Sequence, residues 1–491
     1  MRMNDQTNPS GSRMHTNLAW TAGGRVTSEG LRVGGHLLLT RLLPPEAFGL
    51  FLILNTFVQG LTAFSDVGIN ASIIQNKSGE QRAFLDTAWT LQVARGFLLW
   101  TLCFIAAPFV AEFYDQPDLS FFIPIGAISL IFVGFTSPAL PLLQRRLNLK
   151  RWVVVDVIAQ SSAVLLMVAL AWFTQSVWAL IAGALATTFT LLVISHTIDP
   201  SYRPKFGWHA DAARALIGFG VWILINTPLG WLADNADRLA MGRLVPLDIL
   251  GVFQIASMIG GMPFRLLSAV AGNVVFPTFS NAIHTGLNLR SVYLQLERAV
   301  LVLGALMVCG LVAFGPPAID LLLEPRWHDA AAMLVPIAAS QWFRIAAITP
   351  ANALFSLGYP QYLVLGNLAK LVGYILFIPV FLLNAGGEEI IITALWGFAA
   401  GEAMAPLLYR ILLRWHVPSV GWEEYRIVFL LAISCSIIVI GSTWLEENGV
   451  NLFGRASFGA LIMAIFWGHS AVYGARAILQ LTQKKRPTAA Q

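Results

Sequence analysis

Charge is scarce in this chain of 491 residues. Only 12% of the residues are Asp, Glu, Lys or Arg, against roughly 25% in ordinary soluble proteins. Hydrophobic residues make up 57%, and apolar stretches of about 20 residues, the length that crosses a bilayer, recur from end to end. The composition therefore argues against a set of soluble domains and indicates an all-α integral membrane protein.

Cysteine and metal-binding motifs are also scarce. The three cysteines, Cys103, Cys309 and Cys435, each lie inside an apolar stretch, and no CxxC or Cys/His spacing occurs. We therefore expect no disulfide framework, no metal site and no cofactor. The first 17 residues are polar and lack the apolar core of a signal peptide. No nucleophile–base arrangement is visible, so we expect a protein that is not an enzyme.

The hydropathy pattern predicts about fourteen membrane-spanning helices joined by short loops. They cover 18–39, 48–71, 83–108, 119–141, 152–173, 177–197, 212–233, 248–273, 293–315, 331–355, 361–384, 389–411, 427–445 and 456–478. With the N-terminus in the cytoplasm, twenty of the 31 Lys and Arg residues lie on the inner side and five on the outer side. This bias predicts that both termini are cytoplasmic. It also explains the net charge of +5 without nucleic-acid binding, and the basic tail QKKRP is expected to contact anionic membrane lipid.

One sequence motif, predicted to form a turn between two spans, occurs twice. LTRLLPPEAFGLFLI at 39–53 aligns without a gap with MGRLVPLDILGVFQI at 241–255, an offset of 202 residues. The identical pairs are Arg41/Arg243, Leu42/Leu244, Pro44/Pro246, Gly49/Gly251, Phe51/Phe253 and Ile53/Ile255. A weaker echo pairs Pro138 with Pro350, and both prolines are expected to bend equivalent helices.

Both copies of the turn follow an odd-numbered span, so both are expected on the outer face. The sequence therefore predicts two parallel six-helix repeats around a central cavity, a known transporter design, plus two C-terminal helices. The corresponding domains are an N-terminal lobe at 1–210, a C-terminal lobe at 211–425, and a helix pair with a basic tail at 426–491.

Further motifs carry a family resemblance. They are RLLPPEAFGL at 41–50, DVGINASIIQNK at 66–77, QRRLNLKRWVVVDV at 144–157 and NADRLAMGRLV at 235–245. In order and spacing they resemble the polysaccharide-flippase (Wzx/PST) family of the MOP superfamily, over roughly residues 18–415. The resemblance implies a bacterial inner-membrane protein that exports lipid-linked oligosaccharides, with the polymerase of the same glycan pathway as a further partner.

Six cations belong to neither the inner nor the outer group, and within a span an isolated charge costs at least about 2.5–3.5 kcal/mol. They are Arg25, Arg32, Arg95, Arg265, Arg344 and Lys370, and the acids considered with them are Glu29, Asp66, Asp156 and Glu402. Polar stripes at helical spacing join them, through Asn55 and Gln59 on 48–71 and through Gln254 on 248–273. These stripes predict a water-filled, basic cavity, with the cations, Asn55, Gln59 and Gln254 binding substrate.

Structural alternatives stay open for each group. Arg25 and Arg32 can pair with Glu29, while Arg95 and Lys370, each alone on its helix, can extend toward the membrane surface. Asp156 can pair with a loop cation. Asp66, Asp156, Glu29 and Glu402 are candidates for ion coupling or for ion pairs in the cavity. The glycines of 18–39 can serve either bending or close helix packing.

A basic cavity lined by amides suits a polyprenyl diphosphate-linked oligosaccharide, because arginine forms forked hydrogen bonds with phosphate. The sequence therefore favours a flippase that works by alternating access, moving repeat units to the outer leaflet for exopolysaccharide, O-antigen or capsule biosynthesis. Two alternatives remain: a MATE-like exporter of small molecules, and a membrane polymerase or ligase acting on the same glycans.

Overall fold

The computed structural model describes residues 9–146, 148–199, 202–382 and 390–417, with single positions at 437, 457, 461 and 462. Within these ranges the chain is helical and contains no strand. It divides into two compact units, Met1–Gly251 and Val252–Gln491. The first unit ends one helix later than the predicted N-terminal lobe, and the predicted lobe boundaries stay a prediction.

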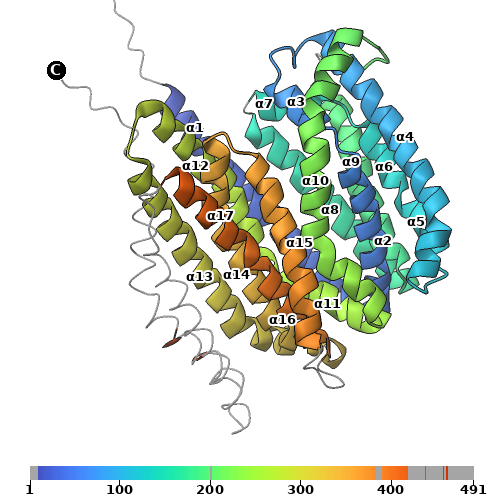
Figure 1. The fold of residues 1–491 in the computed structure, drawn as a ribbon. Coiled ribbons are helices and arrows are strands. Elements are labelled where there is room, and N and C mark those ends of the chain that lie inside the picture. The colour runs from blue at the N-terminus through green and yellow to red at the C-terminus, as the bar shows by residue number, and fades with distance from the viewer. Residues whose placement is uncertain are drawn as a thin grey trace, which may run out of the picture. The chain divides into compact units, whose positions relative to one another are not determined.

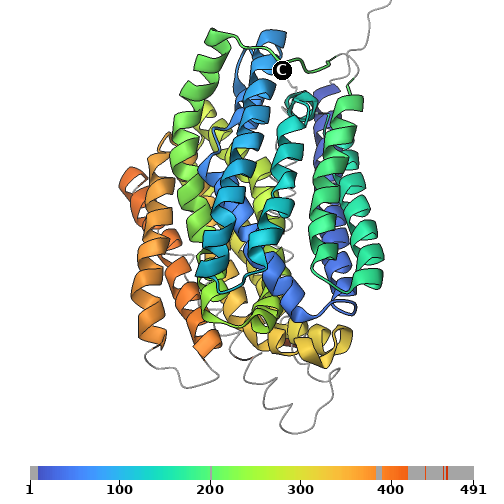
Figure 2. The same ribbon diagram turned by 90° about the vertical axis from the view of Figure 1, so that its right-hand side faces the viewer.

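The helices of the first unit run alongside one another, coloured blue to green in Figures 1 and 2. They are α1 (Pro9–Leu39), α2 (Pro45–Phe64), α3 (Ile69–Gln75), α4 (Arg82–Phe113), α5 (Leu119–Gly126), α6 (Ile128–Phe135), α7 (Ala139–Arg145), α8 (Leu149–Thr174), α9 (Trp178–Thr197) and α10 (Ala210–Leu244). The main pairings within this unit are α8 with α9, α1 with α8, α4 with α6 and α10 with α2.

Helix α11 (Leu247–Gly260) begins in the first unit and ends in the second. The second unit continues with α12 (Met262–Thr285), α13 (Leu289–Leu322), the 3₁₀ turn Pro325–Trp327, α14 (Asp329–Ser356), α15 (Gln361–Leu382), α16 (Ile390–Glu402) and α17 (Met404–His416). Its core joins α12, α13, α14 and α17 around buried side chains such as Leu301, Ile345 and Leu354.

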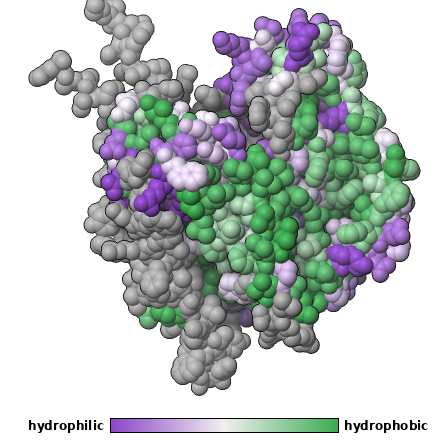
Figure 3. All heavy atoms as spheres, viewed as in Figure 1, coloured by the Kyte–Doolittle hydropathy of each residue, from purple (hydrophilic) through white to green (hydrophobic). Residues whose placement is uncertain are grey.

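Among the described residues, nine helical segments are long and apolar enough to cross a membrane, or ten if a bent pair is counted as one span. Figure 3 shows a broad hydrophobic band on the side of the first unit, between hydrophilic ends. The protein is therefore a multi-pass membrane protein. The expected spans 427–445 and 456–478 lie outside the described residues.

Several predicted spans are broken in the structure. The span 119–141 consists of α5, α6 and α7, with a bend of 59° before α7, because Pro138 cannot continue the hydrogen-bond ladder of a helix. Helix α14, by contrast, runs unbroken through Pro350. The predicted span 248–273 is divided between α11 and α12, and the described part of the predicted span 389–411 is divided between α16 and α17.

The predicted span 48–71 also ends early. Helix α2 stops at Phe64, and Gly68 adopts the left-handed conformation with φ of 63°. The backbone N–H of Gly68 donates to the Asp66 carboxylate at 2.9 Å. Asp66 therefore belongs to the turn after α2 and not to the polar stripe along it.

Helix α1 packs closely on α8 through two of its glycines. A Cβ at Gly24 would meet Val153, and a Cβ at Gly35 would meet Val164. Both glycines and both valines are eleven residues apart, so the two helices run parallel. Gly23, Gly30 and Gly34 have open space around them. Close packing therefore accounts for Gly24 and Gly35.

The two copies of the repeated turn lie against each other. A Cβ on Gly49 would overlap the carbonyl oxygen of Leu247, and a Cβ on Gly251 would overlap the carbonyl oxygen of Pro45. Since Pro45 and Leu247 occupy equivalent places in the two copies, the contact is reciprocal. Only glycine allows the N-terminal turns of α2 and α11 to approach this closely.

Candidate functional site

Glu402 is the centre of a buried charge cluster in the second unit. Its side chain is 5% exposed, and its Oε1 accepts hydrogen bonds from Arg344 Nε at 2.9 Å and from the Tyr374 hydroxyl at 2.8 Å. Lys370 Nζ lies 3.6 Å from the second carboxylate oxygen. The guanidinium of Arg344 also lies 5.6 Å from the ring centre of Phe264. Donors from α14 and α15 thus converge on one anionic group at the end of α16.

The sequence predicted the members of this cluster but not their association. Arg344 has no acid nearby along its own helix, and Lys370 is the one charged residue of its span, so both looked isolated. The structure places Glu402 between them. Tyr374, one helical turn after Lys370 on α15, was missed, and its i+4 spacing from Lys370 was the available signal.

Arg95 connects α4 to the end of α2. Its Nη2 donates to the carbonyl oxygen of Thr62 at 2.7 Å, and its Nε donates to the Ser65 hydroxyl at 3.0 Å. Carbonyl groups in the last turn of a helix have no partner within the helix. Arg95 therefore supplies donors to the C-terminus of α2, a structural contact that spacing within 83–108 could not reveal.

Arg265 has a related role at the break between α11 and α12. Its Nη2 donates to the carbonyl oxygen of Met258 at 2.6 Å, in the last turn of α11. Gly261 lies at the break, where a Cβ would meet the Arg265 guanidinium. Arg265 thus holds the two helices at this break through a backbone contact.

The charges of α1 pair locally and with α8. Arg32 forms an ion pair with Glu29 at 2.5 Å, as one of the sequence alternatives held. Ser28 donates to the Asp156 carboxylate at 2.6 Å, so the contact of Asp156 is a hydroxyl on α1 and not a loop cation. Arg25 lies on α1, but its side chain falls outside the described part of the structure.

The predicted amide ligands lie at different depths. Gln59 is exposed and Asn55 is half-buried on α2. Gln254 on α11 is also half-buried, and its Oε1 is a buried atom with no hydrogen-bond partner. Asn55 and Gln59 belong to the first unit, whereas Gln254 and the Glu402 cluster belong to the second. The roles of these amides stay predictions.

A second buried ion pair was missed by sequence reasoning. Arg410 Nη2 contacts Glu297 Oε1 at 2.5 Å and the carbonyl oxygen of Ala346 at 3.1 Å. Glu297 is 1% exposed. Both residues lie near the expected inner membrane surface, and Arg410 is one of the twenty Lys and Arg residues assigned to the inner side. The pair fastens α13, α14 and α17 together.

Two of the family-like motifs meet at the expected inner face. Arg145 Nη1 donates to the carbonyl oxygens of Ile73, Ile74 and Asn76, at the C-terminus of α3. Arg146 pairs with Glu80 at 3.3 Å. The motif at 144–157 thus holds the motif at 66–77 in place.

The segment before α10 is fastened to α4. The Tyr202 hydroxyl donates to Asp86 Oδ1 at 3.0 Å, and the backbone N–H of Lys205 donates to the same oxygen at 3.2 Å. Burial and the hydrogen bond to Asp86 raise the pKa of Tyr202 above its usual value of 10.0. The ring of Phe206 lies 4.6 Å from that of Trp89.

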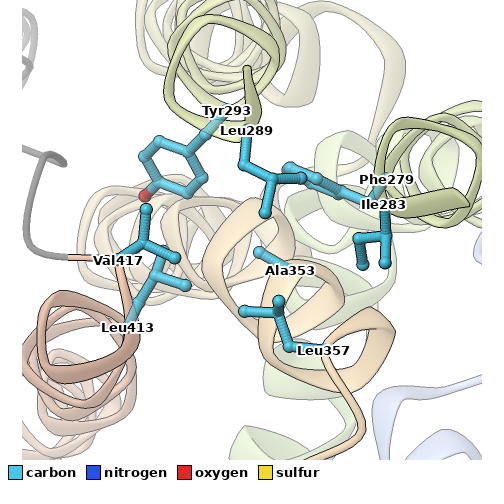
Figure 4. A pocket seen from close by; sticks show the side chains of 8 residues that line it. All are labelled: Phe279, Ile283, Leu289, Tyr293, Ala353, Leu357, Leu413 and Val417. Atoms are coloured by element: carbon cyan, nitrogen blue, oxygen red, sulfur yellow. The ribbon is translucent and has the colours of Figure 1, made fainter. Parts of the chain in front are cut away.

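An apolar pocket lies between α12, α13, α14 and α17 (Figure 4). Its lining residues are Phe279, Ile283, Leu289, Tyr293, Ala353, Leu357, Leu413 and Val417. The Tyr293 hydroxyl is the one polar side-chain group among these residues. Such a lining suits hydrocarbon, whereas the Glu402 cluster suits an anion.

The sequence of this chain is similar to that of known proteins. The sequence model of the family described as polysaccharide biosynthesis protein matches residues 38–332. Succinoglycan biosynthesis transport protein ExoT of Rhizobium meliloti (strain 1021) is 24% identical over 326 residues, which cover 66% of this chain and 65% of that protein. The match thus spans just under two thirds of this relative.

Solved structures show the same fold. Lipid II flippase MurJ in an inward closed conformation superposes with a TM-score of 0.70 and 11% identity, over 94% of this chain and 99% of MurJ. An inward-facing multidrug resistance MATE family transporter of the MOP superfamily superposes with a TM-score of 0.64 and 13% identity, over 80% of this chain and 95% of that one. Because the family model covers more than half of the sequence, the chain belongs to the polysaccharide biosynthesis protein family.

Proposed function

We propose that this protein is a flippase that moves polyprenyl diphosphate-linked oligosaccharides from the cytoplasmic to the outer leaflet of a bacterial inner membrane by alternating access. The family and the name of the relative ExoT support a role in polysaccharide export. In this proposal the chain has fourteen spans in two six-helix repeats plus two further helices, with both termini in the cytoplasm. The polymerase of the same pathway acts on the exported repeat units.

The Glu402 cluster is the observation that carries the proposal. Arg344, Lys370 and Tyr374 surround the two carboxylate oxygens of Glu402, and all four residues belong to segments long and apolar enough to cross a membrane. In this structure the three donors bind the Glu402 carboxylate, which is a compact group of negatively charged oxygens. A diphosphate presents the same chemistry, and arginine and lysine are its usual ligands. We propose that the diphosphate displaces Glu402 from Arg344 and Lys370 during transport.

The membrane voltage acts in the right direction for this export. The cytoplasm is electrically negative, so moving an anionic headgroup outward is favourable by about 2.3 kcal/mol per charge per 100 mV. The polyprenyl chain stays in the bilayer while the headgroup crosses. The voltage therefore contributes to export whether or not an ion is coupled to it.

The fold does not distinguish this proposed flippase from a MATE-like exporter of small molecules, because structures of MurJ and of a MATE transporter both superpose on the chain. The charges separate them. An exporter of organic cations is expected to offer anionic groups to its substrate, whereas the accessible member of this cluster is Arg344, whose side chain is 18% exposed against 5% for Glu402. A polymerase or ligase would need an acceptor site, for which the short predicted outer loops leave little room.

Charge-neutralising variants test the proposal. Arg344→Gln leaves Glu402 with the Lys370 cation, so it should cost less than the about 3–5 kcal/mol of breaking a buried pair outright. The double variant Arg344→Gln/Glu402→Gln removes both charges of the Arg344–Glu402 pair, but it also takes the carboxylate away from Lys370 and should be the less stable of the two. We expect both variants to lose export in a strain lacking the chromosomal gene. Normal export by a well-folded double variant would refute the role of this cluster.

A further inference from the structure

Two polar atoms at the contact between α2 and α10 have no hydrogen-bond partner. They are the indole Nε1 of Trp231 and the hydroxyl of Thr56. Gly60, one turn after Thr56 on α2, faces the ring of Trp231, where a Cβ would lie 2.8 Å from a ring carbon. Since residues four apart share a helix face, Thr56 and Trp231 both belong to this contact.

These two groups differ from several threonine and tryptophan side chains of the first unit that do have partners. The hydroxyls of Thr62 and Thr87 donate to the carbonyl oxygens of Val58 and Ala83, one turn back along their helices. The indole of Trp89 donates to the carbonyl oxygen of Phe135 at 3.2 Å. Thr56 is 4% exposed and makes no such bond. A buried polar group without a partner destabilises the fold. Binding of a ligand would explain why the Thr56 hydroxyl and the Trp231 indole N–H are present despite this cost.

The same stretch of α10 has a further irregularity. Pro228 lies inside the helix, between Trp231 and Asn226, and it removes one backbone hydrogen bond. The Oδ1 of Asn226 is likewise a buried atom without a partner. An indole donor, a threonine hydroxyl and an amide acceptor therefore occur within a few turns of one helix pair. Sugars match this combination, because each hydroxyl both donates and accepts.

We propose that the α2–α10 contact is a sugar-binding surface, closed in this structure, on which Trp231 and Thr56 donate to hydroxyl oxygens of the glycan. The inference rests on the proposed flippase function and extends it from the diphosphate to the sugars. The indole also offers a flat apolar face, and Phe64 supports it edge-on with ring centres 6.1 Å apart. Exposed Gln59, on the same helix as Thr56, extends the polar surface.

The test removes each polar group. Thr56→Val replaces the hydroxyl by a methyl group with little change in shape, and because the hydroxyl has no partner in this structure, this variant should keep or raise the thermal unfolding midpoint of the purified full chain. Trp231→Phe deletes the indole N–H together with one ring, so its midpoint should fall by the lost packing alone, which is less than the fall for Trp89→Phe, where a hydrogen bond is lost as well. Each should reduce export of the cell's own lipid-linked oligosaccharide by about five- to tenfold, the share of one neutral hydrogen bond.

Matched controls come from groups that do have partners. Trp89→Phe and Thr87→Val each delete a hydrogen bond made in the fold, so the unfolding midpoint should fall while export per folded molecule stays normal. The readout is the leaflet location of radiolabelled lipid-linked oligosaccharide in a deletion strain carrying each variant, normalised to folded protein.

The outcomes separate this inference from the proposed function. Stable Trp231→Phe and Thr56→Val variants with impaired export support the sugar-binding surface. Normal export by both variants overturns it, and so does a fall in their stability equal to that of the controls, which would reveal a structural role. If the deletion strain itself places its oligosaccharide normally, the flippase function fails instead.

Discussion

Replacing Gly49 by alanine should push apart α2 and α11, which are in close contact at this glycine. The new Cβ would overlap the carbonyl oxygen of Leu247 and approach the backbone nitrogen of Gly251 to 3.2 Å. These are backbone atoms, so relief requires a movement of α11 relative to α2. Overpacking typically costs about 1–3 kcal/mol, and a rigid neighbour favours the upper end. The higher helix propensity of alanine offsets about 1 kcal/mol of this loss in folding stability. We therefore expect a net loss of about 2 kcal/mol.

Gly34→Ala is the matched control. Gly34 also lies inside a helix, but nothing approaches its Cβ position within 4 Å. The same substitution there should stabilise the protein by about 0.5–1 kcal/mol. Thermal unfolding in detergent should thus lower the midpoint for Gly49→Ala and raise it for Gly34→Ala. Gly251→Ala should match Gly49→Ala, and the double variant should cost less than the sum, because one separation relieves both overlaps. Equal midpoints for Gly49→Ala and Gly34→Ala would refute the close contact.

Three further predictions concern contacts outside the Glu402 cluster. Arg145→Gln removes the donors to the end of α3, so hydrogen exchange over 69–76 should accelerate while that of α8 stays unchanged; unaltered exchange over 69–76 would contradict this role. Glu297→Gln leaves the largely buried Arg410 without its acid and should cost about 3 kcal/mol in chemical unfolding, an expectation that fails if Arg410→Gln/Glu297→Gln is no more stable than the single variant. Because the pKa of Tyr202 is raised by burial and by its bond to Asp86, the folded state holds the phenol proton more tightly than the unfolded state does. The stabilisation is complete below about pH 10 and is lost as the pH rises further, so the difference in unfolding midpoint between the wild type and Tyr202→Phe should stay constant up to about pH 10 and shrink as the pH rises above it; a difference that stays constant above about pH 10 would contradict it.

The membrane class could be read from the sequence because hydropathy is a local property. Spans such as 152–173 and 177–197 correspond closely to α8 and α9. The breaks were harder to predict. Gly68 ends the turn after α2, and Gly261 marks the division between α11 and α12, but an isolated glycine in an apolar stretch has several readings.

The sequence predicted three charged residues of the candidate site, but it did not predict which of them contact one another. Helical periodicity shows which face of one helix a residue occupies, but it does not show which other helix packs there. Arg344, Lys370 and Glu402 come from three helices, and no spacing rule connects them. The partners of Arg95 and Arg265 are backbone carbonyl groups, which leave no mark on a sequence. Trp231 could not be singled out either, since tryptophan is common in membrane proteins.

The most direct test of the flippase function is the leaflet location of lipid-linked oligosaccharides in cells lacking the gene. An impermeant glycan-modifying enzyme, added to intact spheroplasts, reports which repeat units face outward. The proposed function predicts that complete repeat units accumulate and stay protected on the cytoplasmic side, and that the wild-type gene restores their accessibility. Accumulated units that the enzyme reaches from outside would contradict it, because the missing step would then follow translocation.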